Sequence, residues 1–517
     1  MVAAGNENPQ FVATETFKYM PKGVVKQGRA ELPLHYPALL RSDAYVNGQW
    51  VQAKSGKTQK VFNKATLEEI GTVPTQTATD TEAAIDAAYD ALPAWSKRTP
   101  KERHDLLYKL YHKINEHVDD LAHIIVAENG KTLPDAQSEV AYSNSFVEWF
   151  AEEALRAYGT TVPAPNPAVR NIVIKQPIGV AGLLAPWNFP LAMITRKLAP
   201  ALAAGCTGVI KAPCEAPLSA LALAQLIDEV GFPKGVVNVL IAERGEDEQA
   251  MGRTLCESPK IRTISFTGST RVGKILAEQS ASTLKKLSME LGGNAPFIVF
   301  EDANLDLAVN SLLQCKFRCA GETCVSANRV FLADKIFDEF AEKLVAKASE
   351  FKVGYGMDKG VTMGPLNNEM GKKKIEEHIH KVKQAGGDVL LGGQAGEGLF
   401  FEPTVVKAPA GKHMPTDDEE TFGPLAVLYR FSSEEEVIQR ANNVNVGLAG
   451  YFFSQDVGRC FRVGEALQVG MVGINTGMIS QNTIPFGGVK ESGFGREGGP
   501  TGIDEFLVEK TLVFSGL

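Results

Sequence analysis

From residue 171 onward, short apolar segments typical of β-strands alternate with segments of helical periodicity. The first series contains the strands NIVIKQPIGVAGLLA, TGVIKA, GVVNVLIA and IRTISFTG and the helices PLSALALAQLIDEVG and RVGKILAEQSAS. A second series follows Glu290, with the strands APFIVF and RVFLA and the helices LDLAVNSLLQCKF and DEFAEKLVAKASEF. Alternation of this kind builds βαβ units, whose parallel sheet is covered by helices on both faces. The pattern therefore predicts two α/β lobes with a cleft between them.

The regions outside these two series have other patterns. The 517 residues suffice for two or three domains. Residues 1 to about 40 carry Pro and charged residues without a helical period, which predicts an irregular arm on the surface. Residues 79–157 repeat apolar side chains at three- and four-residue spacing, which predicts helices. The tail DEFLVEKTLVFSGL alternates apolar and polar residues, so it predicts a terminal strand that needs a partner edge and favours an oligomer.

Composition excludes several classes of function. A net charge of −8 gives no basic surface for nucleic acid. Seven unevenly spaced cysteines indicate reduced thiols inside a cell, and residues 1–40 fit neither a secretory signal nor a transit peptide, so we expect a cytoplasmic protein. The longest uncharged run, residues 176–195, is broken by prolines, so it predicts buried loop and strand and no membrane span.

One segment, ISFTGSTRVGK at residues 264–274, sets a glycine turn between a strand and a helix. Backbone N–H groups at such a turn can hold a phosphate. The segment matches the start of a P-loop, but Ile275 stands where a hydroxyl must bind magnesium, which disfavours an ATPase. A dinucleotide pyrophosphate site and an ordinary strand-to-helix turn both remain open.

Two other short motifs contain polar residues with alternative readings. Asn188 in PWNFP is either a satisfied structural amide or a donor to an oxyanion. Glu290 in MELGGN either caps a turn or, in an apolar loop, acts as a general base with a raised pKa.

The candidate metal ligands do not form a metal-binding pattern. Cys315, Cys319 and Cys324 lack a fourth ligand at a suitable spacing. His378 and His380 lie two apart on a predicted helix and face different directions. We therefore expect no metal.

Six motifs occur together and in order: PWNFP, FTGSTRVGK, MELGGN, GETC, EETFGP and PFGGVKESGFGREGG. In this combination the chain resembles the aldehyde dehydrogenase superfamily from about Tyr45 to its C-terminus. The resemblance implies an aldehyde dehydrogenase-like α/β fold with two Rossmann-like lobes and a β oligomerisation arm. It implies a cofactor-binding domain at 41–158 and 179–292, a catalytic domain at 293–475, an oligomerisation arm at 159–178 and 484–517, and an N-terminal arm at 1–40. A homodimer or homotetramer without nucleic-acid or membrane partners is expected.

The resemblance also implies catalytic roles. Cys324 would attack the aldehyde carbon, because a planar carbonyl cannot expel hydride until a nucleophile has added. The alkoxide would be held by the Asn188 amide and the Cys324 backbone N–H. Glu290 would then deprotonate the water that hydrolyses the thioester. A non-catalytic binding or structural protein is the alternative, and it would require the loss of one of these three residues.

For the cofactor, the resemblance implies a NADP or NAD site. Lys211 and Cys214 would lie at the adenosine ribose, and Ser269 at the pyrophosphate. The complete set of expected cofactor residues is Pro186, Trp187, Lys211, Cys214, Gly268, Ser269, Gly273, Leu291, Glu420 and Phe422. Cys214 stands where NAD-selective members often have a glutamate that repels a 2′-phosphate, so we expect NADP to be accepted, although the neighbouring Glu215 could substitute.

Within the superfamily, KFR before the nucleophile, MITRK and MIS resemble the branch that oxidises succinate semialdehyde to succinate, as in 4-aminobutyrate degradation. Arg196, Arg318 and Ser480 would then bind the far carboxylate of the substrate, since guanidinium groups grip carboxylates through paired hydrogen bonds. A broader enzyme for other short acid semialdehydes, such as glutarate semialdehyde, is the alternative. Ser326 stands where many relatives carry a second cysteine, so a disulfide switch there is not expected, and Cys319 is a packing thiol or a resolving thiol for Cys324.

Overall fold

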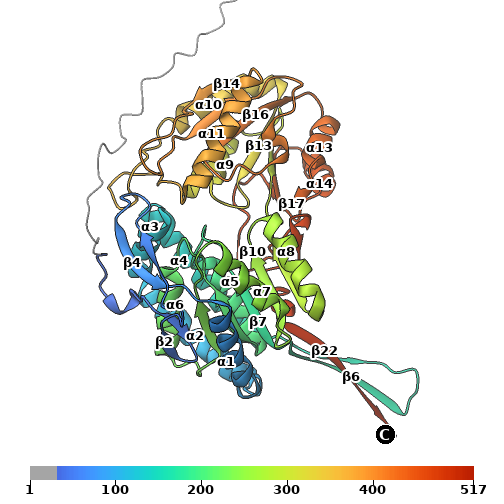
Figure 1. Cartoon of the computed structure of the whole chain (residues 1–517). Helices are drawn as coiled ribbons and strands as arrows, with labels where there is room; N and C mark the ends of the chain where they lie inside the picture. Colours follow the sequence, from blue (N-terminus) through green and yellow to red (C-terminus); the bar gives the residue numbers. More distant parts are fainter. Residues whose placement is uncertain (1–31, 517) are drawn as a thin grey trace, which may run out of the picture.

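The computed structural model describes residues 32–516, which form two α/β lobes and a long β-strand projection (Figure 1). The lower lobe in Figure 1 contains the first α/β series and the upper lobe contains the second. The predicted α/β class is confirmed. Residues 1–31 of the predicted N-terminal arm lie outside the described residues. Within residues 32–40 the chain forms a short turn, η1 (Pro37–Leu39), and the backbone N–H groups of His35 and Tyr36 donate to Asp120.

Four helices precede the parallel strands of the first sheet, as the apolar periodicity of residues 79–157 predicts. They are α1 (Ala78–Ser96), α2 (Pro100–Glu116), α3 (Val118–Asn129) and α4 (Leu133–Ala154). Their ends follow local rules. Thr99 and Glu102 form a capping box at the start of α2, and Gly130 ends α3 in the left-handed conformation that glycine adopts without strain.

The sheet of the first lobe contains eight strands. Their spatial order is β2 (Gln49–Val51), β1 (Ala44–Val46), β9 (Val237–Leu240), β8 (Thr207–Lys211), β7 (Val180–Leu184), β10 (Ile261–Thr267), β11 (Lys286–Glu290) and β21 (Gly493–Phe494). Strands β9, β8, β7, β10 and β11 are parallel. The chain builds outward from β7 to β9 on one side and then crosses back to β10 and β11 on the other. Ligands of such sheets bind at this reversal, beyond the carboxyl ends of the strands.

The helices between these strands are α5 (Ala192–Ala204), α6 (Leu218–Val230), α7 (Glu246–Glu257) and α8 (Thr270–Ser280). The prediction of loop and strand for residues 176–195 is wrong at its end, where α5 begins. The reason is a long-range cap: the buried Glu139 carboxylate accepts hydrogen bonds from the backbone N–H groups of Leu191 and Ala192. Local sequence cannot reveal a cap that comes from another helix.

The second lobe is built on a seven-stranded sheet. Its order is β14 (Asp388–Leu391), β15 (Thr404–Lys407), β16 (Leu425–Phe431), β13 (Ala327–Ala333), β12 (Ala295–Val299), β18 (Ala449–Phe453) and β19 (Met471–Ile474), and only β14 is antiparallel to its neighbour. Its helices are α9 (Leu305–Phe317), α10 (Phe337–Ala348), α11 (Glu369–Gln384), α12 (Pro415–Asp418), α13 (Glu434–Asn442) and α14 (Val457–Ala466). Each lobe has its own apolar core, so the site between them has rigid walls.

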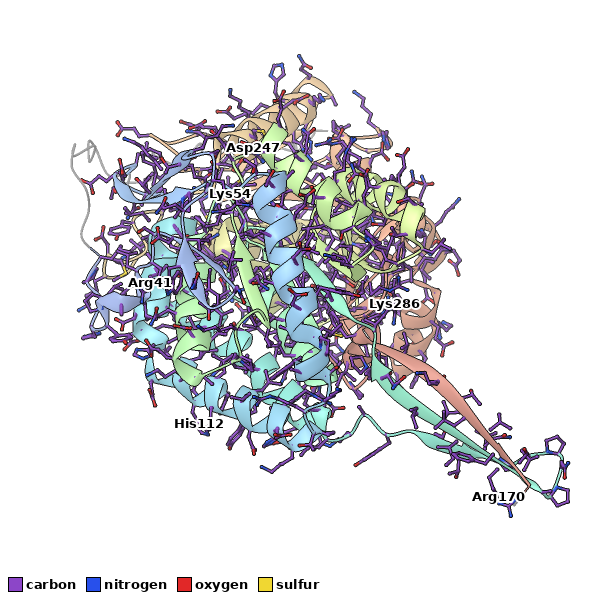
Figure 2. The ribbon with its side chains drawn as sticks, turned by 60° about the horizontal axis from the view of Figure 1, so that its bottom comes forward. Arg41, Lys54, His112, Arg170, Asp247 and Lys286 are labelled. Carbon is purple, nitrogen blue, oxygen red and sulfur yellow. The ribbon has the colours of Figure 1, made fainter. Side chains whose placement is uncertain are left out.

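Three antiparallel strands form the projection, namely β5 (Thr160–Val162), β6 (Val169–Pro177) and β22 (Leu507–Ser515). All nine residues of β22 pair with β6, from Leu507 opposite Pro177 to Ser515 opposite Val169. The predicted terminal strand is thus confirmed, with a partner edge inside the same chain. The projection reaches far from the lobes, with Arg170 near its tip (Figure 2). Two further pairs complete the sheets, β3 (Thr58–Phe62) with β4 (Glu69–Pro74) and β17 (Val446–Gly447) with β20 (Val489–Lys490).

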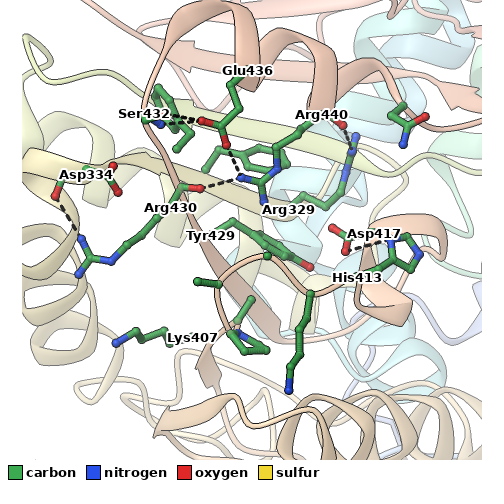
Figure 3. Close-up of a pocket in the computed structure, with 18 of the residues that line it drawn as sticks. Arg329, Asp334, Lys407, His413, Asp417, Tyr429, Arg430, Ser432, Glu436 and Arg440 are labelled. Carbon is green, nitrogen blue, oxygen red and sulfur yellow. Dashed lines mark hydrogen bonds and ion pairs between the residues drawn. The ribbon is translucent and has the colours of Figure 1, made fainter.

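A cavity of about 870 Å³ opens on one face of the second sheet (Figure 3). Its basic side chains are largely engaged within the protein. The buried Arg329 guanidinium donates to the carbonyl oxygens of Asn294, Arg440 and Ala441 at 2.9–3.1 Å. Arg440 donates to the Arg430 carbonyl oxygen at 2.7 Å and to the Glu436 carboxylate at 3.1 Å. These bonds make the cavity wall a structural joint between β12, β13 and α13.

We expect Arg329→Met to lower the free energy of unfolding by about 3 kcal/mol, because three buried carbonyl oxygens lose their donors. The shift in the midpoint of urea denaturation measures this loss. Arg430→Met is the matched control, since Arg430 is only partly buried and pairs with the exposed Asp338, a contact worth about 0–1 kcal/mol. Equal midpoint shifts in the two variants would contradict the structural role of Arg329.

Candidate active site

The carboxyl ends of the strands in the first sheet face the amino ends of the strands in the second. The carboxyl ends of β7, β8, β10 and β11 lead into Asn188, Lys211, Ser269 and Glu290, whereas Cys324 and Phe422 lie just ahead of β13 and β16 in the second lobe. Three contacts join the edges. Asn188 Nδ2 donates to the Glu322 carbonyl oxygen at 3.2 Å, the rings of Trp187 and Phe422 meet edge to face at 5.6 Å, and the Gly293 N–H donates to Glu420 at 3.4 Å. The site is therefore assembled from both lobes.

Cys324 lines a cavity of about 170 Å³ at this junction. All three residues predicted to bind the substrate carboxylate, Arg196, Arg318 and Ser480, line the same cavity, together with Tyr142 and Phe189 on the facing helices and loop. Burial raises the pKa of the Cys324 thiol to about 12, although the nearby Arg196 opposes this shift. The thiol is therefore protonated at neutral pH before a ligand enters, and a proton acceptor is needed to form the thiolate.

A left-handed backbone segment lies just before Cys324, the predicted nucleophile. Cys319, Ala320 and Gly321 have φ angles of 50°, 52° and 73°. A Cβ atom on Gly321 would lie 2.4 Å from the carbonyl oxygen of Gly423, so only glycine lets this loop pack against the residue after Phe422. Two non-glycine residues in this conformation store strain of about 1–3 kcal/mol each. Such strain is common where a catalytic side chain must be held in one place.

Asn188 lies on a short loop anchored by buried groups. Its backbone carbonyl oxygen accepts a hydrogen bond from Lys131 Nζ at 2.7 Å, and Lys131 is also paired with Glu139. The Asn188 Nδ2 atom makes the single bond to Glu322, and its Oδ1 atom has no partner among the described residues. The amide therefore has one N–H available for a further acceptor, as the predicted oxyanion role requires.

Glu290 is the last residue of β11 and is 2% exposed. Neither carboxylate oxygen has a hydrogen-bond partner in residues 32–516. Burial, reinforced by the charge of Glu497, raises the pKa of Glu290 well above its ordinary value, whereas Arg196 lowers it. The sequence analysis expected Glu290 in an apolar loop, and its burial and raised pKa agree with that expectation. The residue instead ends a strand, and the charged groups of Glu497 and Arg196 act on it.

Glu497 lies at the centre of a buried ion cluster that influences the pKa of Glu290. Its carboxylate accepts from Arg196 Nε and Lys197 Nζ, and Lys197 also donates to Thr267 Oγ1 at 2.6 Å. Burial alone would raise the pKa of Glu497, but Arg196 and Lys197 hold it below its ordinary value. Sequence reasoning missed Glu497 and Lys197. Glu497 lies within the segment GREGG and Lys197 within MITRK. Nothing in the local sequence indicates that these residues, 300 positions apart, share one ion cluster.

The two arginines of the cavity differ in their environment. Arg196 is 1% exposed, pairs with Glu497 and lies over the Phe486 ring, and its Nη2 atom is left without a partner among the described residues. The Arg318 guanidinium lies 6.0 Å from the centre of the Phe189 ring and makes no ion pair with any residue that the structure describes. Both groups thus retain donors that can face the cavity.

Most of the predicted cofactor residues lie at or near the carboxyl ends of strands in the first sheet, whereas Glu420 and Phe422 lie ahead of β16 in the second lobe. A Cβ atom on Gly273 would lie 2.5 Å from Leu291 Cδ2, and one on Gly268 would lie 2.4 Å from the Phe266 ring. These two glycines let α8 and its preceding turn lie close to the sheet. Ser269 caps α8 by accepting from the Val272 N–H at 3.4 Å. The close turn after β10, the N-terminus of α8 and Lys211 at the end of β8, two strands away, form a donor set that fits a dinucleotide.

Three predicted cofactor residues have distinct electrostatic surroundings. Lys211 pairs with Glu248, and the Cys214 thiol donates to Glu215 at 3.1 Å. Burial raises the pKa of Glu420 to about 7, although the Gly293 N–H opposes the shift. Pro186 opens the loop that carries Trp187 and Asn188.

No group of three or more His, Cys, Asp or Glu side chains within residues 32–516 is arranged to hold a metal ion. His378 contacts Thr421 Oγ1 at 3.1 Å, and His380 contacts Gln384. Nor is any helix in the described range long and apolar enough to cross a membrane.

The chain belongs to the aldehyde dehydrogenase family, whose model matches residues 50–512. The resemblance drawn from the six motifs is thereby confirmed. A succinate-semialdehyde dehydrogenase (NADP+), GabD of Escherichia coli K12, is 51% identical over 92% of this chain and 98% of its own length. A glutarate-semialdehyde dehydrogenase of Pseudomonas putida KT2440 is 50% identical over 92% of this chain and 98% of its own.

Solved structures agree with these relatives. A crystal structure of an Escherichia coli NADP-dependent enzyme superimposes with a TM-score of 0.91 at 50% identity, covering 93% of this chain and 100% of that one. Betaine aldehyde dehydrogenase from Staphylococcus aureus, solved with NAD+, gives a TM-score of 0.88 at 34% identity over 92% of this chain and 96% of that one.

Because burial raises the pKa of Cys324, we expect its alkylation by iodoacetamide to keep accelerating as the pH rises from 6 toward the thiol's value of about 12. The measurement is the rate of modification of the peptide that contains Cys324, followed by mass spectrometry in the absence of substrate and coenzyme. Cys460, which is partly exposed on α14, provides an internal comparison in each sample. A plateau in the rate of Cys324 alkylation by about pH 7 would contradict the predicted rise in pKa, because only a thiol of low pKa is fully ionised at that pH.

Proposed function

We propose that this protein oxidises succinate semialdehyde to succinate with NADP+ or NAD+, as a step of 4-aminobutyrate degradation. The observation that carries the proposal is a small cavity lined by Cys324 and by Arg318, which has no ion-pair partner within residues 32–516. An aldehyde with a carboxylate at its other end satisfies both groups. The relatives named above as succinate-semialdehyde dehydrogenases support this substrate.

The reaction begins with Cys324. Its thiol releases a proton to solvent water, the sulfur adds to the aldehyde carbon, and the carbonyl oxygen becomes an alkoxide. The free N–H of the Asn188 amide and the backbone N–H of Cys324 are the donors available to hold that alkoxide. NADP+ or NAD+, when bound, would supply the acceptor for the hydride that leaves this carbon. A thioester with Cys324 remains.

Hydrolysis of the thioester depends on Glu290. With a raised pKa and no hydrogen-bond partner in the described chain, the Glu290 carboxylate is free to take a proton from water, and the hydroxide released attacks the thioester. Succinate leaves and the Cys324 thiol is restored. Since only the ionised carboxylate acts as a base, the hydrolytic rate rises with pH as Glu290 loses its proton.

The coenzyme would be held along the carboxyl edge of the first sheet. Lys211 and Cys214 would contact the adenosine ribose, and the turn of Gly268 and Ser269 would contact the pyrophosphate. The nicotinamide end would lie among Glu420, Phe422, Trp187, Pro186 and the Leu291 wall that Gly273 packs against. Acceptance of NADP+ is supported by the relatives named for that coenzyme.

Glutarate semialdehyde is a second candidate substrate. Two curated relatives about 50% identical to this chain are named glutarate-semialdehyde dehydrogenases. The same carboxylate-binding cavity would accept a chain one methylene longer, because a single methylene changes binding by only about 1–3 kcal/mol.

The assignment of the chain to domains is also a proposal. Residues 41–158 and 179–292 form the cofactor-binding domain, residues 293–475 the catalytic domain, and residues 159–178 with 484–517 the oligomerisation arm, preceded by an N-terminal arm at 1–40. The exposed apolar residues Val508, Val513 and Phe514 of β22 support a homodimer or homotetramer built through the projection. The free cysteines support a cytoplasmic location.

We expect Arg318→Ala to lower kcat/KM for succinate semialdehyde about 100-fold, the loss of a charge-assisted contact worth about 3 kcal/mol. The same variant should lower kcat/KM for butanal less than about threefold, because butanal has no carboxylate. Steady-state kinetics on both aldehydes measures the difference. Arg318→Lys, which keeps the charge, should recover part of the lost activity. Equal losses on both aldehydes would show that Arg318 shapes the loop and does not bind the acid.

Glu290→Gln should separate the two halves of the reaction, because an amide cannot take a proton from water. We expect a burst of about one reduced coenzyme per subunit, followed by turnover about 100-fold slower than the wild type or slower still. Stopped-flow absorbance measures the burst, and mass spectrometry should find a succinyl group on the Cys324 peptide.

Glu322→Gln is the matched control for this experiment. Glu322 is also buried, and burial raises its pKa to about 8, but its carboxylate accepts from the Asn367 N–H and does not face the cavity of Cys324. This variant should turn over without a trapped acyl group. Wild-type turnover in Glu290→Gln would exclude Glu290 as the base.

A further inference from the structure

Lys211, at the carboxyl end of β8, is held by a carboxylate that the sequence motifs do not include. Its Nζ atom pairs with Glu248, which lies 37 positions later, in the first turn of α7. Burial alone would lower the pKa of Lys211, but the Glu248 carboxylate raises it above its ordinary value. The Lys211 side chain is 11% exposed and that of Glu248 is 30% exposed, so the pair faces solvent through Glu248.

The neighbouring acid, Glu215, is engaged elsewhere. Its carboxylate accepts from the Cys214 thiol at 3.1 Å and pairs with Arg244 at 3.2 Å. Glu215 therefore has a cation and a thiol of its own, whereas Glu248 is the acid in direct contact with Lys211. The expectation that Glu215 could replace the glutamate missing at position 214 is not supported by this arrangement.

The start of α7 is strongly acidic. Glu246, Asp247 and Glu248 occupy its first turn, and Glu243 immediately precedes it. Asp247 faces outward and pairs with Lys57 at 2.9 Å, and Figure 2 shows Asp247 at the surface of the lobe. Several carboxylates at the start of α7 thus lie near the buried ammonium group of Lys211, and Glu248 contacts it directly.

From this geometry we propose that Glu248 is the residue that sets the coenzyme preference of this protein. This inference rests on the proposed function, because it takes Lys211 to be at the adenosine ribose. A ribose with a free 2′-hydroxyl can donate to a carboxylate, whereas a 2′-phosphate is repelled by it. Glu248 therefore favours NAD+ over NADP+, and NADP+ must separate Glu248 from Lys211 before its phosphate can reach the ammonium group.

The test is a direct binding measurement without any aldehyde. Isothermal titration calorimetry of the full chain gives Kd for NAD+ and for NADP+ in the same buffer. In Glu248→Gln we expect the ratio Kd(NADP+)/Kd(NAD+) to fall about tenfold, because one repulsive charge is removed while the side chain keeps its size. The ratio of kcat/KM values for the two coenzymes should fall in parallel.

Glu246→Gln is the matched control, since it removes the same charge from the same turn of α7 at an exposed position. Its Kd ratio should stay within about twofold of the wild type, because screening by solvent weakens distant surface charges. A second comparison uses Lys211→Met, in which adding Glu248→Gln should have a much smaller effect on NADP+ binding, since the ammonium group that the phosphate would contact is absent.

The outcomes separate this inference from the proposed function. An unchanged Kd ratio in Glu248→Gln, or an equal change in Glu246→Gln, overturns the role of Glu248 while leaving the dehydrogenase reaction intact. Failure of the wild-type protein to bind either coenzyme would instead contradict the proposed function.

Discussion

The buried contact between Glu497 and the two adjacent cations Arg196 and Lys197 is the interaction on which the site depends. Three charges that lie away from water cost several kcal/mol each unless they are paired closely. Pairing makes their positions rigid, and it joins α5 of the first lobe to the loop that follows β21. The same cluster sets the electrostatics of Glu290, because Glu497 disfavours and Arg196 favours its ionised form. The proposed general base, Glu290, and one of the proposed carboxylate-binding residues, Arg196, are thus both influenced by Glu497.

The arrangement of the two sheets explains how a single small cavity contains such different chemical groups. Residues at the carboxyl ends of the first sheet are placed by short turns that follow buried strands, and residues ahead of β13 and β16 are placed by strained backbone at Cys319, Ala320 and Phe422. The Asn188 bond to the Glu322 carbonyl oxygen and the contact of Trp187 with Phe422 hold the two edges together. The nucleophile belongs to one lobe and its expected oxyanion donor and base to the other, so closure of this joint determines catalytic geometry.

Most of the fold could be predicted from sequence because its signals are local, whereas the roles expected for the site residues came from the resemblance carried by six motifs together. Strand and helix periodicity indicated both lobes, and glycine-rich motifs indicated the turns near Ser269 and Glu290. The start of α5 could not be predicted, since its cap comes from Glu139 on another helix. For the same reason Glu497 and Glu248 were invisible: each acts through a cation far away in the sequence, and an isolated glutamate is usually a solvated surface residue. Local sequence patterns do not reveal charge pairs between residues that are far apart in the chain.

The position of Glu497 has a consequence for biosynthesis. Its partner Arg196 lies 301 residues earlier in the chain, and β22, which covers β6, comes later still. While the ribosome is still making the second lobe, the nascent first lobe therefore holds two buried cations with no counter-charge and a β6 edge with no neighbour. Exposed strand edges of this kind are recognised by chaperones or aggregate, and contacts of such sequence separation form slowly. The catalytic centre is thus one of the last parts of the molecule to be completed.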